Sequence, residues 1–190
     1  MTHFLRLHHD AILVGVGTAV ADDPSLSCRY PGVTLDKQPR PVIVDPNLRW
    51  SSTEAAVVRL AEGQQGKDPL VVCRQGNVHS VTSSHVEIMA LRTDGLLDWH
   101  TMLRELKTKG INSIMIEGGA TILNALLMQP ELVDSVIVTV APTWLGRGGV
   151  HVSPEANEAN GVRQNSARLT DTAWKQFGAD AVLCGRLERC

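Results

Sequence analysis

Two short segments of the chain combine glycines with side chains that can bind anions or orient polar groups. The first begins at Gly15–Thr18 and runs through Asp22 to Arg29, so a hydroxyl, a carboxylate and a guanidinium follow one apolar run. Ligand sites in open α/β sheets lie where strands end, which makes this segment a candidate binding loop. The alternative is turn and capping chemistry without a ligand, because Asp22, Asp23 and Pro24 are good turn residues. Taken alone, this segment favours the second interpretation.

The second segment is Glu117-Gly118-Gly119-Ala120-Thr121, where an apolar run enters a helical pattern through two glycines. Glycines let backbone N–H groups approach an anion, and the start of a helix favours negative charge. A phosphate or pyrophosphate is the ligand that this chemistry suits, although a tight strand–helix turn explains the glycines equally well. The segment is not the G-x-G-x-x-G fingerprint of a Rossmann domain and lies late in the chain.

Short apolar runs bounded by turn residues predict the elements that must position these segments. We expect buried strands, two helices and a closing pair of strands joined by a turn at 178–180. Asp98 is the expected N-cap of the first helix and Gly110 its stop. Residues 2–9 read as the last turns of a further helix, and 154–165 as a polar loop. The strands are expected at 11–16, 41–45, 70–73, 86–90, 111–116, 132–142, 167–177 and 181–187, and the two helices at 98–109 and 120–128. Alternating strands and helices with a closing hairpin indicate one α/β domain, residues 1–190, with a mixed sheet.

Composition excludes several classes of function. Hydrophobic residues make up 43% of the chain and charged residues 20%, and the net charge is −2 without a basic stripe, so nucleic-acid binding has no electrostatic support. No apolar run is long enough to span a bilayer, and the first residues lack the core of a secretory signal. The four cysteines show no metal-ligand spacing. We therefore expect a cytoplasmic protein with reduced thiols, no metal site and no membrane partner.

Four motifs occur in a fixed order along the chain. They are AILVGVGTAVADDPSLSCR, PRPVIVDP, INSIMIEGGA and LVDSVIVTVAPTWLG. This order resembles the riboflavin-biosynthesis reductase family, in its stand-alone fungal and archaeal form and in the reductase domain of the bacterial deaminase–reductase. The resemblance implies a dihydrofolate-reductase-like α/β fold, a mixed sheet flanked by helices. It also implies NADPH-dependent reduction of 2,5-diamino-6-ribosylamino-4(3H)-pyrimidinone 5′-phosphate to its ribitylamino form.

The same resemblance implies roles for individual residues. It places the cofactor on Thr18, Asp22, Leu91, Glu117, Gly118, Gly119, Ala120 and Thr121. It places the phosphorylated pyrimidine substrate on Arg6, Leu26, Arg29 and Glu117. For Arg6 the alternative is a solvated helix residue. No general base is assigned, because hydride transfer depends mainly on holding two reactants in a reactive geometry.

The family resemblance also implies a homodimer and an N-terminal strand with a Ser-x-Asp-Gly-like turn ahead of the segment that begins here at Thr2. The chain has no segment that corresponds to this strand. We therefore also consider an alternative function, a truncated and catalytically impaired remnant that acts at most as a folding or dimerisation unit. A reductase that acts on another pyrimidine or pteridine is a third possibility, since a fold does not determine a substrate.

Overall fold

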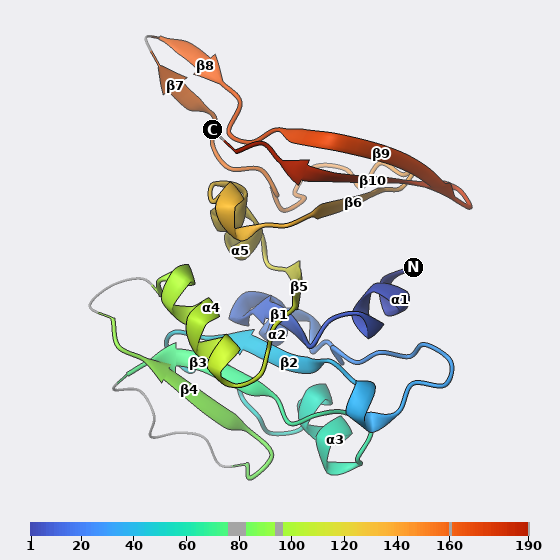
Figure 1. Cartoon of the computed structure of the whole chain (residues 1–190), viewed down its shortest axis with the longest axis vertical. Coiled ribbons are helices and arrows are strands. Elements are labelled where there is room, and N and C mark those ends of the chain that lie inside the picture. Colours follow the sequence, from blue (N-terminus) through green and yellow to red (C-terminus); the bar gives the residue numbers. More distant parts are fainter. Residues whose placement is uncertain (76–82, 94–96, 160, 190) are drawn as a thin grey trace. The chain divides into compact units, whose positions relative to one another are not determined.

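The computed structural model describes residues 1–75, 83–93, 97–159 and 161–189 (Figure 1). The chain divides into two compact units, an N-terminal unit, Met1–Gly119, and a C-terminal unit, Ala120–Cys190. Each unit is described by itself below. The expectation of a single domain stays a prediction.

The N-terminal unit is built on a parallel sheet of five short strands. Their order in the sheet is β4-β3-β2-β1-β5, so β1 lies between β2 and β5. The three central strands are almost fully buried, which explains why each reads as a continuous apolar run and not as an alternating pattern. The strands are β1 (Ala11–Gly15), β2 (Arg40–Val44), β3 (Leu70–Arg74), β4 (Glu87–Leu91) and β5 (Ile114–Gly118). All five were expected, with ends shifted by at most three residues.

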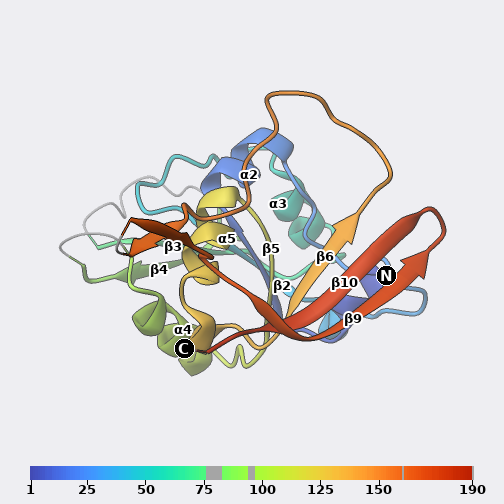
Figure 2. The same cartoon turned by 90° about the horizontal axis from the view of Figure 1, so that it is seen from above.

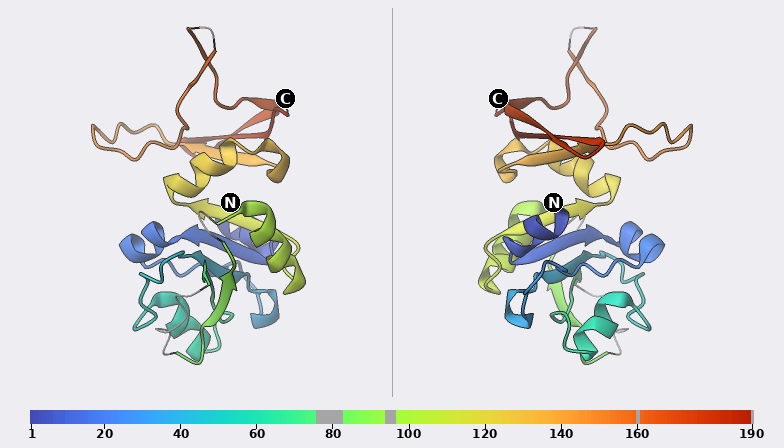
Figure 3. Two further views of the ribbon diagram at one scale, coloured as in Figure 1. Left: turned by 90° about the vertical axis from the view of Figure 1, so that its left-hand side faces the viewer. Right: turned by 90° about the vertical axis from the view of Figure 1, so that its right-hand side faces the viewer.

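Helices cover both faces of this sheet. The helices are α1 (Thr2–Leu7), α2 (Val16–Asp22), α3 (Ala56–Glu62) and α4 (Trp99–Thr108), with a short 3-10 turn, η1 (Leu35–Lys37). One core cluster joins Ala19 of α2 and Val57 and Val58 of α3 to one face of the central strands. Helix α4 lies on the opposite face of the sheet (Figure 3), and its Met102 and Leu106 are buried. The chain moves in one direction across the sheet from β1 to β4 and returns in the other direction, through α4, to β5. Right-handed crossovers in opposite directions lie on opposite faces of a parallel sheet, which explains why α4 lies opposite α2 and α3.

The predicted boundaries of α4 are nearly those observed. The Asp98 carboxylate accepts a hydrogen bond from the Thr101 N–H at 2.7 Å, which is the expected N-cap. Gly110 follows the helix with a φ of +80°, a conformation that favours glycine. Both end signals of this helix are confirmed.

Two helices correct the expectations from sequence. Residues 16–22 were interpreted as part of a binding loop but form α2, which starts directly after β1 and buries Val16 and Ala19. Helix α3 was not predicted at all, and its N-cap residue Ala55 offers no capping side chain. Strand β5 also runs on to Gly118, which pairs with Val14, so Glu117 belongs to a strand and not to the turn.

The C-terminal unit carries the antiparallel part of the fold. Three strands pair in the order β6-β10-β9, which lie side by side in Figure 2. Gly178, with a φ of +62°, turns β9 into β10, so the closing hairpin is confirmed. The expected loop at 154–165 contains a small two-stranded ladder instead. The elements are α5 (Ala120–Leu127), η3 (Pro130–Leu132), β6 (Val136–Val140), β7 (Asn157–Ala159), β8 (Val162–Gln164), β9 (Leu169–Phe177) and β10 (Asp180–Leu187). The chain is therefore α/β, with parallel and antiparallel strands, as expected.

Among the residues described, no helix is long and apolar enough to cross a membrane.

Candidate functional site

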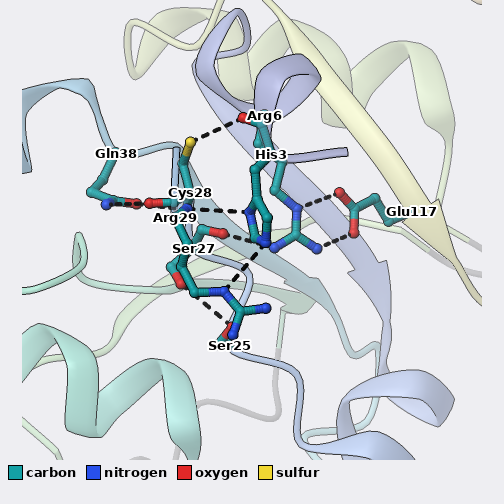
Figure 4. A network of polar contacts seen from close by, with 8 residues as sticks. All are labelled: His3, Arg6, Ser25, Ser27, Cys28, Arg29, Gln38 and Glu117. Carbon is teal, nitrogen blue, oxygen red and sulfur yellow. Dashed lines mark hydrogen bonds and ion pairs between the residues drawn. The ribbon is translucent and has the colours of Figure 1, made fainter. Parts of the chain in front are cut away.

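Arg6 and Glu117 form a two-pronged ion pair between α1 and the end of β5 (Figure 4). Arg6 Nε donates to Glu117 Oε1 at 2.6 Å, and Nη2 donates to Oε2 at 2.5 Å. The third donor nitrogen, Nη1, binds the Ser27 carbonyl at 2.7 Å. The two side chains are only 11% and 18% exposed. Arg6 is thus no solvated helix residue, and its guanidinium is already committed to protein acceptors.

The segment from Ser25 to Arg29 is held rigidly beside this pair. Gln38, which is buried, accepts a hydrogen bond from the Cys28 N–H at 2.8 Å and donates to the Cys28 carbonyl at 2.9 Å. Leu26 anchors the segment from the other side with a side chain that is 2% exposed in the core and a φ of +45°. A residue such as leucine keeps a positive φ only where its surroundings enforce it. The backbone ahead of Arg29 is therefore fixed.

Arg29 is the residue of this site whose charged end is exposed to solvent. Its backbone N–H lies 3.2 Å from Nδ1 of His3, and its Nε lies 3.3 Å from Nε2 of the same ring. Its side chain is exposed, and its two terminal nitrogens have no hydrogen-bond or ion-pair partner within the described part of the chain. A guanidinium whose forked end faces solvent can bind a carboxylate or a phosphate.

His3 is a residue of this site that the sequence analysis missed. Partial burial lowers the pKa of its imidazole below the usual 6.5, and the positive charges of Arg6 and Arg29 lower the pKa further, while Glu117 opposes them. The spacing of His3 and Arg6 could have indicated it, because residues three positions apart on a helix lie on the same face. Nothing local to α1 indicated that Arg29, 26 positions away, would meet that face.

Thr18 and the two glycines after Glu117 form the second part of the site. In the register of β1 against β5, Val14 pairs with Gly118, so the chain leaves both strands at the same edge of the sheet. A Cβ added to Gly119 would lie 3.4 Å from Thr18 Oγ1, and one added to Gly118 would lie 3.6 Å from it. Gly119 also has a φ of +84°. The two glycine-containing motifs are therefore neighbours, as a shared binding site requires.

The two aspartates that follow Thr18 have different roles. Asp23 accepts a hydrogen bond from the Ala56 N–H at 2.9 Å and lies 3.6 Å from the Arg59 guanidinium, so it caps α3. The capping interpretation of this motif is thus confirmed for Asp23. Asp22 ends α2 one turn after Thr18 and is exposed. Its carboxylate remains on the same side of the helix as the Thr18 hydroxyl.

The remaining candidate residues are Leu26, Leu91, Ala120 and Thr121. The Leu26 side chain is buried in the core, so only its backbone could meet a ligand. Leu91 ends β4, three strands from β1 in the sheet, and its carbonyl accepts a hydrogen bond from the Gln75 N–H at 2.8 Å. Ala120 and Thr121 are the first residues of α5, in the C-terminal unit.

The chemical content of the site follows from these positions. It contains a free guanidinium at Arg29, a carboxylate fixed by Arg6, and two glycines, Gly118 and Gly119, that lie next to the Thr18 side chain. Within the described ranges, no three His, Cys, Asp or Glu side chains gather as metal ligands would. The arrangement suits an anionic ligand with several polar groups, bound at the carboxyl edge of a parallel sheet.

Comparisons with known proteins agree with this arrangement. The family model of the RibD C-terminal domain matches residues 1–183. The 2,5-diamino-6-ribosylamino-4(3H)-pyrimidinone 5′-phosphate reductase of Kluyveromyces marxianus is 38% identical over 98% of this chain and 74% of its own length. The solved riboflavin biosynthesis reductase of Saccharomyces cerevisiae matches with a TM-score of 0.85 at 36% identity, over 99% of this chain and 80% of that one. RibD of Acinetobacter baumannii matches with a TM-score of 0.71 at 26% identity, over 98% of this chain and 49% of that one.

Proposed function

The chain belongs to the family of RibD C-terminal domains, and we propose that it uses NADPH to reduce the ribosyl side chain of 2,5-diamino-6-ribosylamino-4(3H)-pyrimidinone 5′-phosphate to the ribitylamino form. It is a reductase of riboflavin biosynthesis with the α/β fold of the RibD reductase domains. The alternative of an impaired remnant is not favoured, because the relatives that match nearly the whole chain are named as reductases.

The observation that carries the proposal is the contact of Thr18 with the Gly118-Gly119 turn. The hydroxyl and the glycine backbone lie together where β1 and β5 end, and a Cβ at position 119 would lie 3.4 Å from the hydroxyl oxygen. Such a cradle fits the pyrophosphate of a dinucleotide, because backbone N–H groups bind phosphate oxygens at close range. Thr18, Gly118 and Gly119 would therefore hold the cofactor.

Asp22 and Leu91 would extend the cofactor site along the carboxyl edge of the sheet. Asp22 would accept hydrogen bonds from the cofactor one helical turn from Thr18. Leu91 ends the strand at the far edge, and three strand spacings correspond to roughly 14 Å. A dinucleotide is long enough to lie along such an edge. Ala120 and Thr121, the first residues of α5, stay in the proposal as cofactor residues because the first N–H groups of a helix can bind a phosphate. Bound NADPH would supply the hydride that C1′ of the ring-opened ribosylamine accepts.

The substrate would use the other half of the site. Arg29 presents a free fork to the 5′-phosphate, where two parallel hydrogen bonds add orientation to charge. Glu117, held by Arg6 through two hydrogen bonds, would orient hydroxyl or amino groups of the substrate. Arg6 would act through Glu117 and through the Ser27 carbonyl, since each of its three side-chain nitrogens already donates to a protein acceptor. The function of these residues is to align the substrate with the cofactor.

A homodimer is part of the proposal. The sheet of the C-terminal unit exposes large apolar side chains that soluble monomers rarely leave uncovered together. Val138, Val140 and Trp174 share one face of this sheet, and Ile137 and Phe177 lie on the other, each 40–62% exposed. A second copy of the chain would bury the face that carries Val138, Val140 and Trp174, and sedimentation equilibrium would report a mass of two chains. A monomer at micromolar concentration would contradict this part of the proposal.

The cysteines support a reducing compartment, and we place the enzyme in the cytoplasm. Cys28, Cys73 and Cys184 are free thiols. Cys28 and Cys73 are buried, and burial raises the pKa of Cys73, which makes its thiol unreactive.

The decisive test is NADPH oxidation by the purified chain. We expect the absorbance of NADPH to fall on addition of the phosphorylated ribosylaminopyrimidinone, and mass spectrometry to find a product two mass units heavier. The same assay with dihydrofolate and with NADH tests the substrate and cofactor assignments. Turnover of dihydrofolate alone, or no turnover at all, would overturn the proposal.

A further inference from the structure

The His3 imidazole lies against Arg29 in a way that the reduction reaction itself does not explain. Its two ring nitrogens face the backbone N–H and the Nε–H of Arg29, at 3.2 and 3.3 Å (Figure 4). Nε is the inner donor of the guanidinium, so this contact fixes the direction of the fork while both terminal nitrogens remain open. No other described side chain forms a hydrogen bond or ion pair with the Arg29 guanidinium.

We propose that His3 is a positioning residue for the substrate phosphate: it aims the Arg29 guanidinium and thereby sets the affinity for the phosphorylated substrate. This inference rests on the proposed function, in which Arg29 binds the phosphate. His3 need not touch the substrate for this role, because it acts through the orientation of Arg29.

The backbone of His3 is itself fixed relative to the Arg29 segment. The Cys28 thiol donates to the His3 carbonyl at 3.1 Å, and Arg6, one turn later in α1, binds the Ser27 carbonyl. The edge of the Phe4 ring also contacts the Tyr30 ring, with centroids 5.9 Å apart. The imidazole is thus presented from a rigid element, which an orienting group requires.

The contact requires a neutral imidazole. A neutral ring has one acceptor nitrogen, so it accepts from one of the two Arg29 donors at a time, whereas a protonated ring accepts from neither. The charged groups that face His3 are Arg6 of α1, Arg29 of the neighbouring segment, Glu117 of β5 and the amino group of Met1. Three of these four are cations, so a protonated His3 would repel Arg29.

Protonation of His3 should therefore weaken phosphate binding. Because the pKa of His3 is lowered, the contact is intact at neutral pH and is lost only as the pH falls below the usual value of 6.5. The substrate phosphate itself gains a proton near pH 6, which would weaken binding independently. The two effects can be separated only by comparison with a variant that does not titrate.

The experiment compares steady-state kinetics of His3→Ala, His3→Gln and the wild type. We expect His3→Ala to raise the KM of the phosphorylated substrate about tenfold, the cost of a hydrogen bond to a charged group. The kcat and the KM of NADPH should stay within twofold. His3→Gln keeps an acceptor oxygen and should recover most of the affinity. His9→Ala is the matched control and should behave as wild type, because the His9 imidazole forms a hydrogen bond only with the Leu5 carbonyl among the residues described.

A double-mutant cycle separates positioning from a general structural effect. In an Arg29→Ala background the further change His3→Ala should have no effect on the KM, because the residue it aims is gone. An undiminished tenfold effect in that background would overturn the inference. An unchanged substrate KM in His3→Ala, with normal turnover by the wild type, would also overturn the inference. No turnover by the wild type would instead mean that the proposed function is wrong.

The pH dependence supplies a second readout. The substrate KM of His3→Gln divided by that of the wild type should be constant above about pH 7 and should fall as the wild type loses its neutral imidazole at lower pH. Competition by inorganic sulfate, whose charge does not change in this range, should show the same trend in its inhibition constant. A ratio that does not change with pH would contradict the role of the neutral ring.

Discussion

Arg6 and Glu117 are 111 positions apart in sequence and are joined by two parallel hydrogen bonds at the end of β5. The pair places the Glu117 carboxylate beside the glycines that would bind the cofactor. Two hydrogen bonds from Arg6 hold the carboxylate there. The exposed Arg29 is left as the cation for the substrate. Of the two arginines expected to bind substrate, Arg29 thus has the chemistry to do so directly.

Replacing Arg6 should weaken both the fold and the site. Arg6→Ala removes the partner of a largely buried carboxylate and three hydrogen bonds, which should lower the free energy of unfolding by about 1–3 kcal/mol. It should also lower kcat, because Glu117 is no longer held. Chemical denaturation and steady-state kinetics measure the two effects. Arg40→Ala breaks a comparable ion pair, with Glu87, at the opposite end of the sheet, so it should lower stability but leave kcat intact. Equal losses of kcat in Arg6→Ala and Arg40→Ala would contradict the proposal that Arg6 supports catalysis by holding Glu117.

Gly119→Val should abolish cofactor binding. The valine side chain would enter the space beside Thr18 Oγ1, where a phosphate is proposed to lie, and its φ of +84° strains any β-branched residue by about 1–3 kcal/mol. Titration of NADPH fluorescence measures the affinity. Gly110→Val is the matched control, since Gly110 has a φ of +80° and an open surrounding after α4. Gly110→Val should lose stability without losing NADPH affinity. Unchanged NADPH affinity in Gly119→Val would contradict the proposal that Thr18 and the two glycines bind the cofactor phosphates.

Arg29→Ala should act on the substrate alone. The loss of a two-pronged contact with a phosphate should raise the substrate KM roughly 10- to 100-fold, with little change in stability because the side chain is exposed. Arg29→Lys keeps the positive charge but loses the forked guanidinium, so its substrate KM should lie between those of the wild type and Arg29→Ala. Arg104→Ala, an exposed arginine of α4, is the control for surface charge. A rise confined to the KM of NADPH would mean that Arg29 binds the cofactor.

Acid should destabilise the fold partly through Glu87. Hydrogen bonds from Lys109 and then from Arg40 lower the pKa of this carboxyl below its usual 4.5. The folded state thus binds the proton less readily than the unfolded chain, so Glu87 contributes stability above about pH 5 that is lost as the pH falls through its folded pKa. Denaturation of Glu87→Gln should show a weaker loss of stability between about pH 5 and pH 3 than the wild type. Parallel pH profiles would contradict this assignment.

Local patterns in the sequence predicted most of the secondary structure. The strands of the parallel sheet are buried on both faces, so each appears as an apolar run, and α4 carries a capping aspartate and a terminal glycine within its own sequence. The helices α2 and α3 were missed because each has only seven residues and lacks a side-chain cap of its own. The cap of α3 comes from Asp23, 33 positions away, which no local pattern can show.

The sequence by itself determined the family, the class of fold and the two motifs that supply the site. Only the tertiary structure decided what each charged residue does. The adjacency of β1 and β5 brings Thr18 to Gly119, and the packing of α1 brings Arg6 to Glu117 and His3 to Arg29. Hydrogen bonds and ion pairs act over about 3 Å in space, whatever the separation along the chain. A sequence lists the available donors and acceptors, but which of them are occupied and which stay free for a ligand follows from the fold.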